Sequence, residues 1–296
     1  MANTTSNQTA PKNFFTMMAN PVIRKMEKNG EFAASTTASY SGIAGKTVFF
    51  LIVTIIGVLL CFILHNVFMS NPALQASMVH VEDTENGIYN LTFAPVEGAI
   101  MAAVLLISLI TPFLAFFIRT TIPVTGTIYS LAQGMLIGYI TVALAPEYKF
   151  ISILAALITL ALVGVMLFIY AKRIIKVTAR FRGIVMGMFF GMVLAGIIFF
   201  ILNLIPAVRN SVVFAGINAF VDQPVIAVGI SVIYVIFACL FMLADFDSIQ
   251  RCVDNRMDKK YEWMAAWGLA YTILYLYFKI LRILLILFGN SRSSSK

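Results

Sequence analysis

One long apolar run of this chain ends in Leu243-Ala244-Asp245-Phe246-Asp247-Ser248-Ile249. We place the run over residues 225–245. A helix of about 20 apolar residues crosses the roughly 30 Å hydrocarbon core of a membrane. Acids at the edge of hydrocarbon are costly and commonly have a function. The stretch therefore predicts a membrane span and marks Asp245 and Asp247 as candidate functional residues.

The whole chain shares this apolar character. Of its 296 residues, 60% are hydrophobic and 11% are charged, whereas soluble domains carry about 25% charged residues. We predict seven spans, over residues 47–69, 96–118, 124–145, 150–170, 183–205, 225–245 and 265–289. Spans joined by short loops pack as one bundle, so we expect an all-α, seven-span membrane domain over residues 46–289. A polar, mobile cytoplasmic tail is expected over 1–45 and a short tail over 290–296.

The charges of the loops predict the orientation. The loop over residues 70–95 contains acids but no Lys or Arg. Basic residues gather after the fourth and sixth spans: Lys172, Arg173, Lys176, Arg180, Arg182, Arg251, Arg256, Lys259 and Lys260. Because cytoplasmic loops are rich in Lys and Arg, we expect a cytoplasmic amino terminus. The net charge of +8 lies beside the spans, so we expect the lipid bilayer as partner and no nucleic acid.

Cysteine and histidine are few and scattered. The cysteines are Cys61, Cys239 and Cys252, without a CxxC motif. His65 and His80 lie far from any second ligand motif. We therefore expect neither a disulfide framework nor a metal site.

Small residues recur at helical spacing in two spans. Gly183, Gly187 and Gly191 are spaced by four in the fifth span, and Gly134 and Gly138 by four in the third. Such stripes allow helices to approach closely in lipid. We expect packing, and not ligand binding, to be the role of these glycines.

No catalytic motif is present. The chain lacks GxSxG, HExxH, P-loop and dinucleotide-binding patterns. Asp245 and Asp247 lie two residues apart, so they point to different sides of a helix and cannot alone form a catalytic dyad. We expect no enzyme activity and no cofactor.

Two roles remain open for Asp245. It either faces water at the membrane edge or turns inward to a partner on another helix. Lys279 and Arg282 share one face of the last span, and Lys279 lies roughly 18 Å along the helix from Trp267. Arg119, at the cytoplasmic end of the second span, matches Asp245 better in depth. A carboxyl beside a second carboxyl titrates near neutrality, whereas one beside Lys or Arg stays ionised.

Several motifs, in matching order, resemble the Bax-inhibitor family, also called the transmembrane Bax inhibitor motif family. They are Tyr129-Ser130-Leu131-Ala132-Gln133-Gly134-Met135-Leu136-Ile137-Gly138, the Leu-Ala-Asp-Phe-Asp at 243–247, and Trp267-Gly268-Leu269 followed by Leu276-Tyr277-Phe278-Lys279-Ile280-Leu281-Arg282. The opening Met18-Ala19-Asn20-Pro21-Val22 is similar to the bacterial branch. The resemblance covers roughly residues 18–289.

The resemblance implies a fold and a function. The fold is six helices in two layers around a central seventh, in the bacterial cytoplasmic membrane. The function is a proton-sensitive calcium leak, in which acids on spans six and seven share a proton and close the path at the cytoplasmic side. A basic residue near the end of span two engages the span-six acid. Asp245 matches the span-six acid, with Asp247 beside it, and Arg119 matches the basic residue.

The chain departs from the family at the span-seven acid. Lys279 stands where that acid is expected. An Asp245–Lys279 ion pair would persist over a wide pH range, and the positive charge would oppose calcium. Two hypotheses follow: a pH-modulated calcium leak with Asp245, Asp247, Lys279 and Arg119 as gate or ion-path residues, or a non-conducting membrane regulator that binds other membrane proteins.

Overall fold

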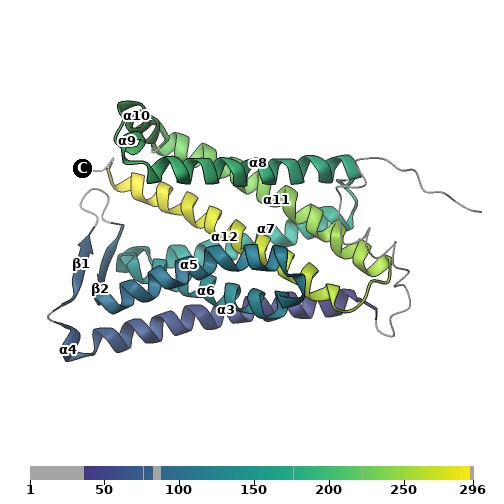
Figure 1. Cartoon of the computed structure of the whole chain (residues 1–296), viewed down its shortest axis with the longest axis horizontal. Coiled ribbons are helices and arrows are strands. Elements are labelled where there is room, and N and C mark those ends of the chain that lie inside the picture. Colours follow the sequence, from purple (N-terminus) through teal and green to yellow (C-terminus); the bar gives the residue numbers. More distant parts are fainter. Residues whose placement is uncertain (1–36, 76, 83–87, 176, 222, 294–296) are drawn as a thin grey trace, which may run out of the picture.

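The computed structural model describes residues 37–75, 77–82, 88–175, 177–221 and 223–293. Seven long helices dominate these residues: α3 (Tyr40–Met69), α5 (Pro95–Phe117), α6 (Ile122–Ala143), α7 (Phe150–Ala171), α8 (Ala179–Leu204), α11 (Pro224–Asp254) and α12 (Tyr261–Ser293). Figure 1 shows them gathered in one bundle. Most of the predicted tail, through residue 36, and residues 294–296 lie outside the described residues.

Short elements join these helices. They are α4 (Pro72–Gln75), β1 (Val79–Glu82), β2 (Asn90–Phe93), η1 (Arg119–Thr121), η2 (Pro146–Tyr148), α9 (Pro206–Arg209) and α10 (Val212–Val221). The two strands form an antiparallel hairpin in which Val79 faces Phe93 and Val81 faces Leu91. The predicted all-α membrane domain is confirmed, and this hairpin in a loop between two long helices is an addition to it. Val79 and Val81 favour a strand over a loop, because β-branched residues suit a pleated backbone.

Local chemistry explains where several helices begin. The Ser39 hydroxyl accepts a hydrogen bond from the Gly42 amide at 3.0 Å, which caps the first turn of α3. Thr178 caps α8 in the same way. Proline occupies the first turn of α5 and α11, where its missing N–H costs nothing. Each cap or proline fixes the first residue of a helix, which lies between one and seven residues before the predicted span.

Six of the described helices are long and apolar enough to cross a membrane: α3, α5, α7, α8, α11 and α12. Their positions agree with six predicted spans. The predicted span over 124–145 corresponds to α6, which has 22 residues and hence the required length. Its composition is more polar, and the six qualifying helices do not include it. The seventh span therefore stays a prediction.

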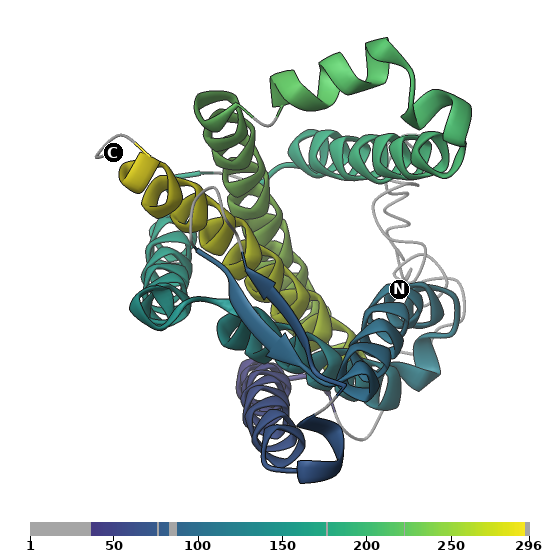
Figure 2. The ribbon, with the colours of Figure 1, turned by 90° about the vertical axis from the view of Figure 1, so that its left-hand side faces the viewer.

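Helix α12 lies at the centre of the bundle. Half of its most apolar stretch is buried, against 28% or less for the other five candidate spans. It contacts α3, α6, α7 and α11, and in Figure 2 it runs through the middle of the bundle. A residue on α12 is therefore well placed to meet side chains from several other helices.

Helix α6 packs tightly against α3 through its glycines. A Cβ on Gly134 would lie 2.8 Å from the carbonyl carbon of Thr54, and one on Gly138 would lie 2.7 Å from the Cβ of Cys61. Real Cβ atoms do not approach so closely, so only glycine allows this contact. The expected packing role of these two glycines is confirmed.

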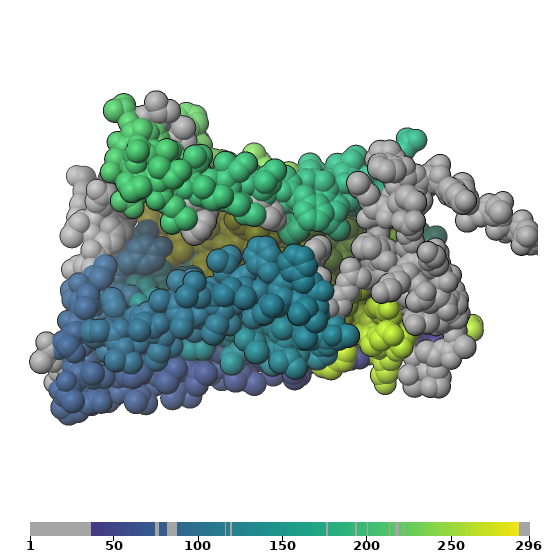
Figure 3. Space-filling model, viewed as in Figure 1, coloured from purple at the N-terminus to yellow at the C-terminus, as the bar shows by residue number. Residues whose placement is uncertain are grey.

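The glycine stripe of α8 behaves differently. A Cβ on Gly183, Gly187 or Gly191 would meet nothing within 4 Å. Only 6% of the most apolar stretch of α8 is buried. The expectation that these glycines pack helices together is wrong for the described residues, because α8 stands at the edge of the bundle. Figure 3 shows a hollow between α8 and α5, with α12 visible at its floor.

Candidate functional site

Asp245 lies inside α11 and not at its end. The helix continues to Asp254, nine residues beyond the predicted end of the span at residue 245. The Asp245 side chain is half-buried and turns toward α12, where the Thr272 hydroxyl donates to its Oδ2 at 2.6 Å. Of the two roles left open by the sequence, the structure thus shows the inward-turned one, although the partner is a hydroxyl.

The surface of α12 opposite Asp245 is formed by residues one turn apart. Gly268 lies next to the carboxyl, and a Cβ there would be in ordinary van der Waals contact with Asp245 Oδ1, at 3.8 Å. The Thr272 hydroxyl also lies 3.2 Å from the Gly268 carbonyl oxygen. Aromatic rings of Trp267, Tyr271 and Tyr129 pack beside this surface, with Tyr129 and Tyr271 stacked at 5.5 Å. These rings fix α12 against α6 next to the acid.

Asp247 is held by two arginines and points away from Asp245. Its Oδ2 lies 3.0 Å from Arg182 on α8 and 2.9 Å from Arg251, one turn further along α11. The two acids therefore project to different sides of the helix, as their spacing predicts. Asp247 acts as a tie between α8 and α11, and its carboxylate is committed to these ion pairs.

Lys279 is not beside Asp245. Its ammonium lies 4.2 Å from the ring centre of Tyr234 and 5.1 Å from that of Tyr275. Such contacts stabilise a cation by about 0.5–2 kcal/mol. Lys279 is seven residues beyond Thr272, or about 10 Å along the helix. The Asp245–Lys279 ion pair considered from the sequence is absent among the described side chains.

Arg119 begins η1, directly after α5. Its side chain lies outside the described ones, so its predicted contact with Asp245 stays a prediction. Among the side chains that the structure does describe, Asp245 has no ion-pair partner. A carboxyl group with a hydroxyl donor and no adjacent cation can gain or lose a proton without breaking an ion pair.

Sequence reasoning missed a buried acid at one end of the bundle. Glu262 has a fully buried side chain that pairs with Lys46 and accepts hydrogen bonds from the amide and hydroxyl of Ser39, at 2.8 and 3.2 Å. Lys46 also lies 5.2 Å from the ring centre of Trp263. We call Ser39, Lys46 and Glu262 the clasp, since they join the start of α3 to the start of α12. In the sequence Glu262 follows a loop with Arg256, Lys259 and Lys260, and nothing there indicates that it is buried.

Thr272, the partner of Asp245, was also missed. It is a single hydroxyl in an apolar helix, and threonines in such helices usually bond to a backbone carbonyl one turn back. Several others in this chain do so, including Thr47, Thr54 and Thr159. Only the pairing of α11 with α12 distinguishes Thr272 from them.

Six candidate membrane-spanning helices gathered in one bundle (Figure 1) define an integral membrane protein of the helical-bundle class. Comparisons with curated proteins and with solved structures gave no match. The chain belongs to the Bax inhibitor 1 like family, whose sequence profile matches residues 20–289.

Proposed function

We propose that this protein is a pH-modulated calcium leak in which Asp245 is the gate acid. One observation carries the proposal: the Asp245 carboxyl meets the Thr272 hydroxyl at 2.6 Å and has no cation beside it among the described side chains. A locked ion pair with Lys279 would argue against a titratable gate. The contact with Thr272 favours a gate that works with one carboxyl, where related proteins are expected to use two.

Lys279 modifies the leak without locking the gate. Its ammonium lies over two tyrosine rings and further along α12 than Asp245. A positive charge at that level repels calcium, so we infer that the leak is slow. Lys279→Asp, which restores the expected acid, should increase calcium flux.

We propose the following placement in the membrane. Helix α6 is the seventh span, and it tolerates polar residues because Ser130, Gln133 and Gly134 are buried against neighbouring helices. The amino terminus and Asp245 lie on the cytoplasmic side of a bacterial cytoplasmic membrane. Arg119 remains a candidate second partner of Asp245, and no enzymatic reaction is proposed.

Calcium flux into liposomes tests the gate. The purified protein is reconstituted with a calcium dye inside, and flux is measured from acidic to alkaline pH. Asp245→Asn imitates the protonated acid. Its flux should therefore match that of the native protein at the acidic end and separate from it at the alkaline end.

Asp254→Asn is the matched control, because Asp254 is an exposed acid on the same helix. It should follow the native profile. Two results would remove the proposal: no calcium flux from either the native protein or Lys279→Asp, or a pH profile that Asp245→Asn leaves unchanged.

A non-conducting regulator that binds other membrane proteins is the second candidate. The exposed face of α8 and the hollow in Figure 3 favour it, because the described residues leave this helix surface uncovered. It predicts no flux, together with a reproducible crosslink from one face of α8 to a single membrane protein in cells. A crosslink pattern spread evenly around α8 would argue against it.

A further inference from the structure

A second group of side chains lies between α3, α5 and α6, far along α3 from the clasp. At one end of this group, His65 and Glu97 form a pair in which His65 Nδ1 lies 2.9 Å from Glu97 Oε1. His65 belongs to α3 and Glu97 to the first turn of α5. This contact fixes the register of the two helices.

The register brings two sulfur atoms to the same level. Helices α3 and α5 are joined by the hairpin segment and run in opposite directions (Figure 1). One turn back from His65 along α3 is Cys61, and one turn forward from Glu97 along α5 is Met101. Because the two helices are antiparallel, Cys61 and Met101 are displaced from the His65–Glu97 contact in the same direction, and they therefore lie at the same level. Cys61 and Met135 of α6 also belong to one buried cluster.

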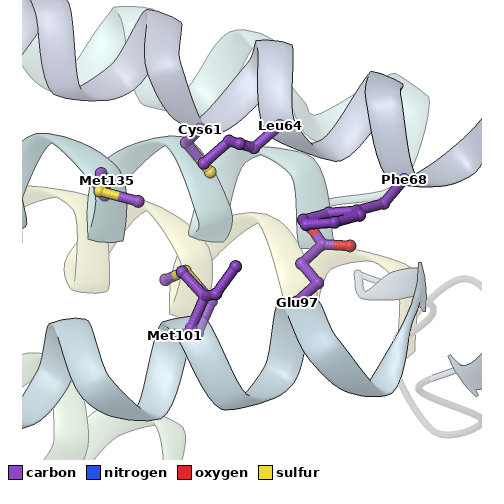
Figure 4. A pocket seen from close by; sticks show the side chains of 7 residues that line it. Cys61, Leu64, Phe68, Glu97, Met101 and Met135 are labelled. Carbon is purple, nitrogen blue, oxygen red and sulfur yellow. The ribbon is translucent and has the colours of Figure 1, made fainter.

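These residues surround a small cavity. Cys61, Glu97, Met101 and Met135 line it, and each is less than 10% exposed. Its volume is about 10 Å³, which accommodates about one water-sized particle. Figure 4 shows the Cys61 sulfur turned into the space between the helices and the Phe68 ring lying against the Glu97 carboxyl group.

The carboxyl group of Glu97, at the wall of the cavity, has one unsatisfied oxygen. Glu97 is 5% exposed, and its Oε2 atom has no hydrogen-bond partner among the described residues. Leaving a buried carboxylate oxygen unpaired is costly. A cation beside it would remove that cost, so charge favours a positive ligand at this position.

The donor atoms select the class of cation. Three of the four polar or sulfur-bearing side chains that line the cavity offer sulfur, one thiol and two thioethers. Calcium requires six to eight oxygen ligands, and structural zinc sites use four ligands from Cys, His and acids. The described residues contain no group of three or more His, Cys, Asp or Glu side chains that could hold a metal ion. Thiol and thioether donors instead suit soft ions such as Cu(I).

We propose that this cavity binds one thiophilic monovalent metal ion of the Cu(I) and Ag(I) class. Cys61, Met101 and Met135 supply sulfur, and Glu97 supplies compensating charge. On binding, the metal–sulfur bond replaces the S–H bond of Cys61, and the thiol proton is taken up by the Glu97 carboxylate, which lines the same cavity and so balances the charge of the ion. The site is independent of Asp245 and of calcium conduction. The sequence alone did not predict it, because its residues come from three helices and methionine is seldom read as a ligand.

Silver titration tests the site without redox chemistry. Ag⁺ is added to the full-length protein in detergent and chloride-free buffer, and binding is followed by calorimetry and by thermal unfolding. The native protein should bind one tight equivalent and unfold at a higher temperature, because a ligand of the folded state stabilises it. Cys239→Ser is the control, since Cys239 does not line the cavity, and it should retain both effects.

Three variants decide the assignment. Met101→Leu conserves volume, so it should fold normally while losing the tight equivalent and the thermal shift. Cys61→Ser should do the same. Glu97→Gln should weaken binding by about 10 to 100-fold, as removal of a group that tunes a metal site does. The proposal is overturned if no tight equivalent binds, which would leave a single buried water as the occupant. It is equally overturned if Met101→Leu and Cys61→Ser bind as the native protein does.

Discussion

Breaking the clasp at Lys46 should destabilise the whole bundle. The Glu262 side chain is fully buried and that of Lys46 is 16% exposed. Lys46→Met preserves most of the side-chain length but leaves Glu262 charged and buried with only the Ser39 hydrogen bonds, at 2.8 and 3.2 Å. Removing one partner of a buried ion pair costs about 3–5 kcal/mol. Because Lys46 retains some contact with solvent, we expect a loss of about 3 kcal/mol in the free energy of unfolding.

A double-mutant cycle separates the ion pair from packing. Glu262→Gln keeps an oxygen that accepts from Ser39 and removes the buried charge. Glu262→Gln combined with Lys46→Met should therefore be more stable than Lys46→Met alone. Unfolding is followed in detergent as loss of the helical circular dichroism signal on heating. Lys259→Met serves as the control, since Lys259 is an exposed lysine in the loop between α11 and α12.

Two results would refute this reasoning. The first is a Lys46→Met protein that unfolds at the same temperature as Lys259→Met and the native protein. The second is a double variant less stable than Lys46→Met by the full cost of Glu262→Gln, because additive effects mean that the two residues do not interact.

Other changes give contrasting outcomes. Gly134→Val should lower the free energy of unfolding by about 1–3 kcal/mol, because the new side chain clashes with α3. Gly187→Val should leave the unfolding temperature unchanged, because a Cβ at Gly187 meets nothing within 4 Å. Equal effects of the two variants would contradict the packing described for α6. Thr272→Val removes the donor to Asp245 and should move the pH profile of calcium flux while the protein remains folded, and an unmoved profile would argue against the gate. Asp247→Asn weakens the tie between α8 and α11 and should raise the mobility of a spin label on α8, measured by its spectral line width; an unchanged width would show that this ion pair does not hold α8.

The membrane-spanning helices follow from the sequence because hydrocarbon imposes a length and a composition on each. The predicted run over 150–170 differs by one residue from α7, Phe150–Ala171. The prediction is poorest where polar residues continue a helix past the apolar run. Helix α11 runs on to Asp254, because its backbone hydrogen bonds persist after the side chains become polar. That difference moved Asp245 from a helix end to a helix interior.

The site was harder to predict because its contacts join distant segments. Asp245 is recognisable in the sequence because an acid in an apolar run has a high free-energy cost. Its partner, however, depends on the register between α11 and α12. That register sets Thr272 opposite Asp245 and Lys279 opposite Tyr234. Nothing in the sequence distinguishes this pairing from one shifted by two turns. The clasp was missed for the same reason, since Lys46 and Glu262 are 216 residues apart.

If α6 is the seventh span, as proposed, its composition bears on how the protein enters the membrane during synthesis. Its buried Ser130 and Gln133 make it a poor substrate for insertion by itself, since each polar group prefers water to lipid. The two helices that cover it, α3 and α5, are both synthesised before it. They can therefore receive α6 directly, so that its polar groups pass from water to protein. In that case the order of the helices along the chain would serve as an assembly sequence, in which the apolar helices α3 and α5 enter first and shelter the more polar α6.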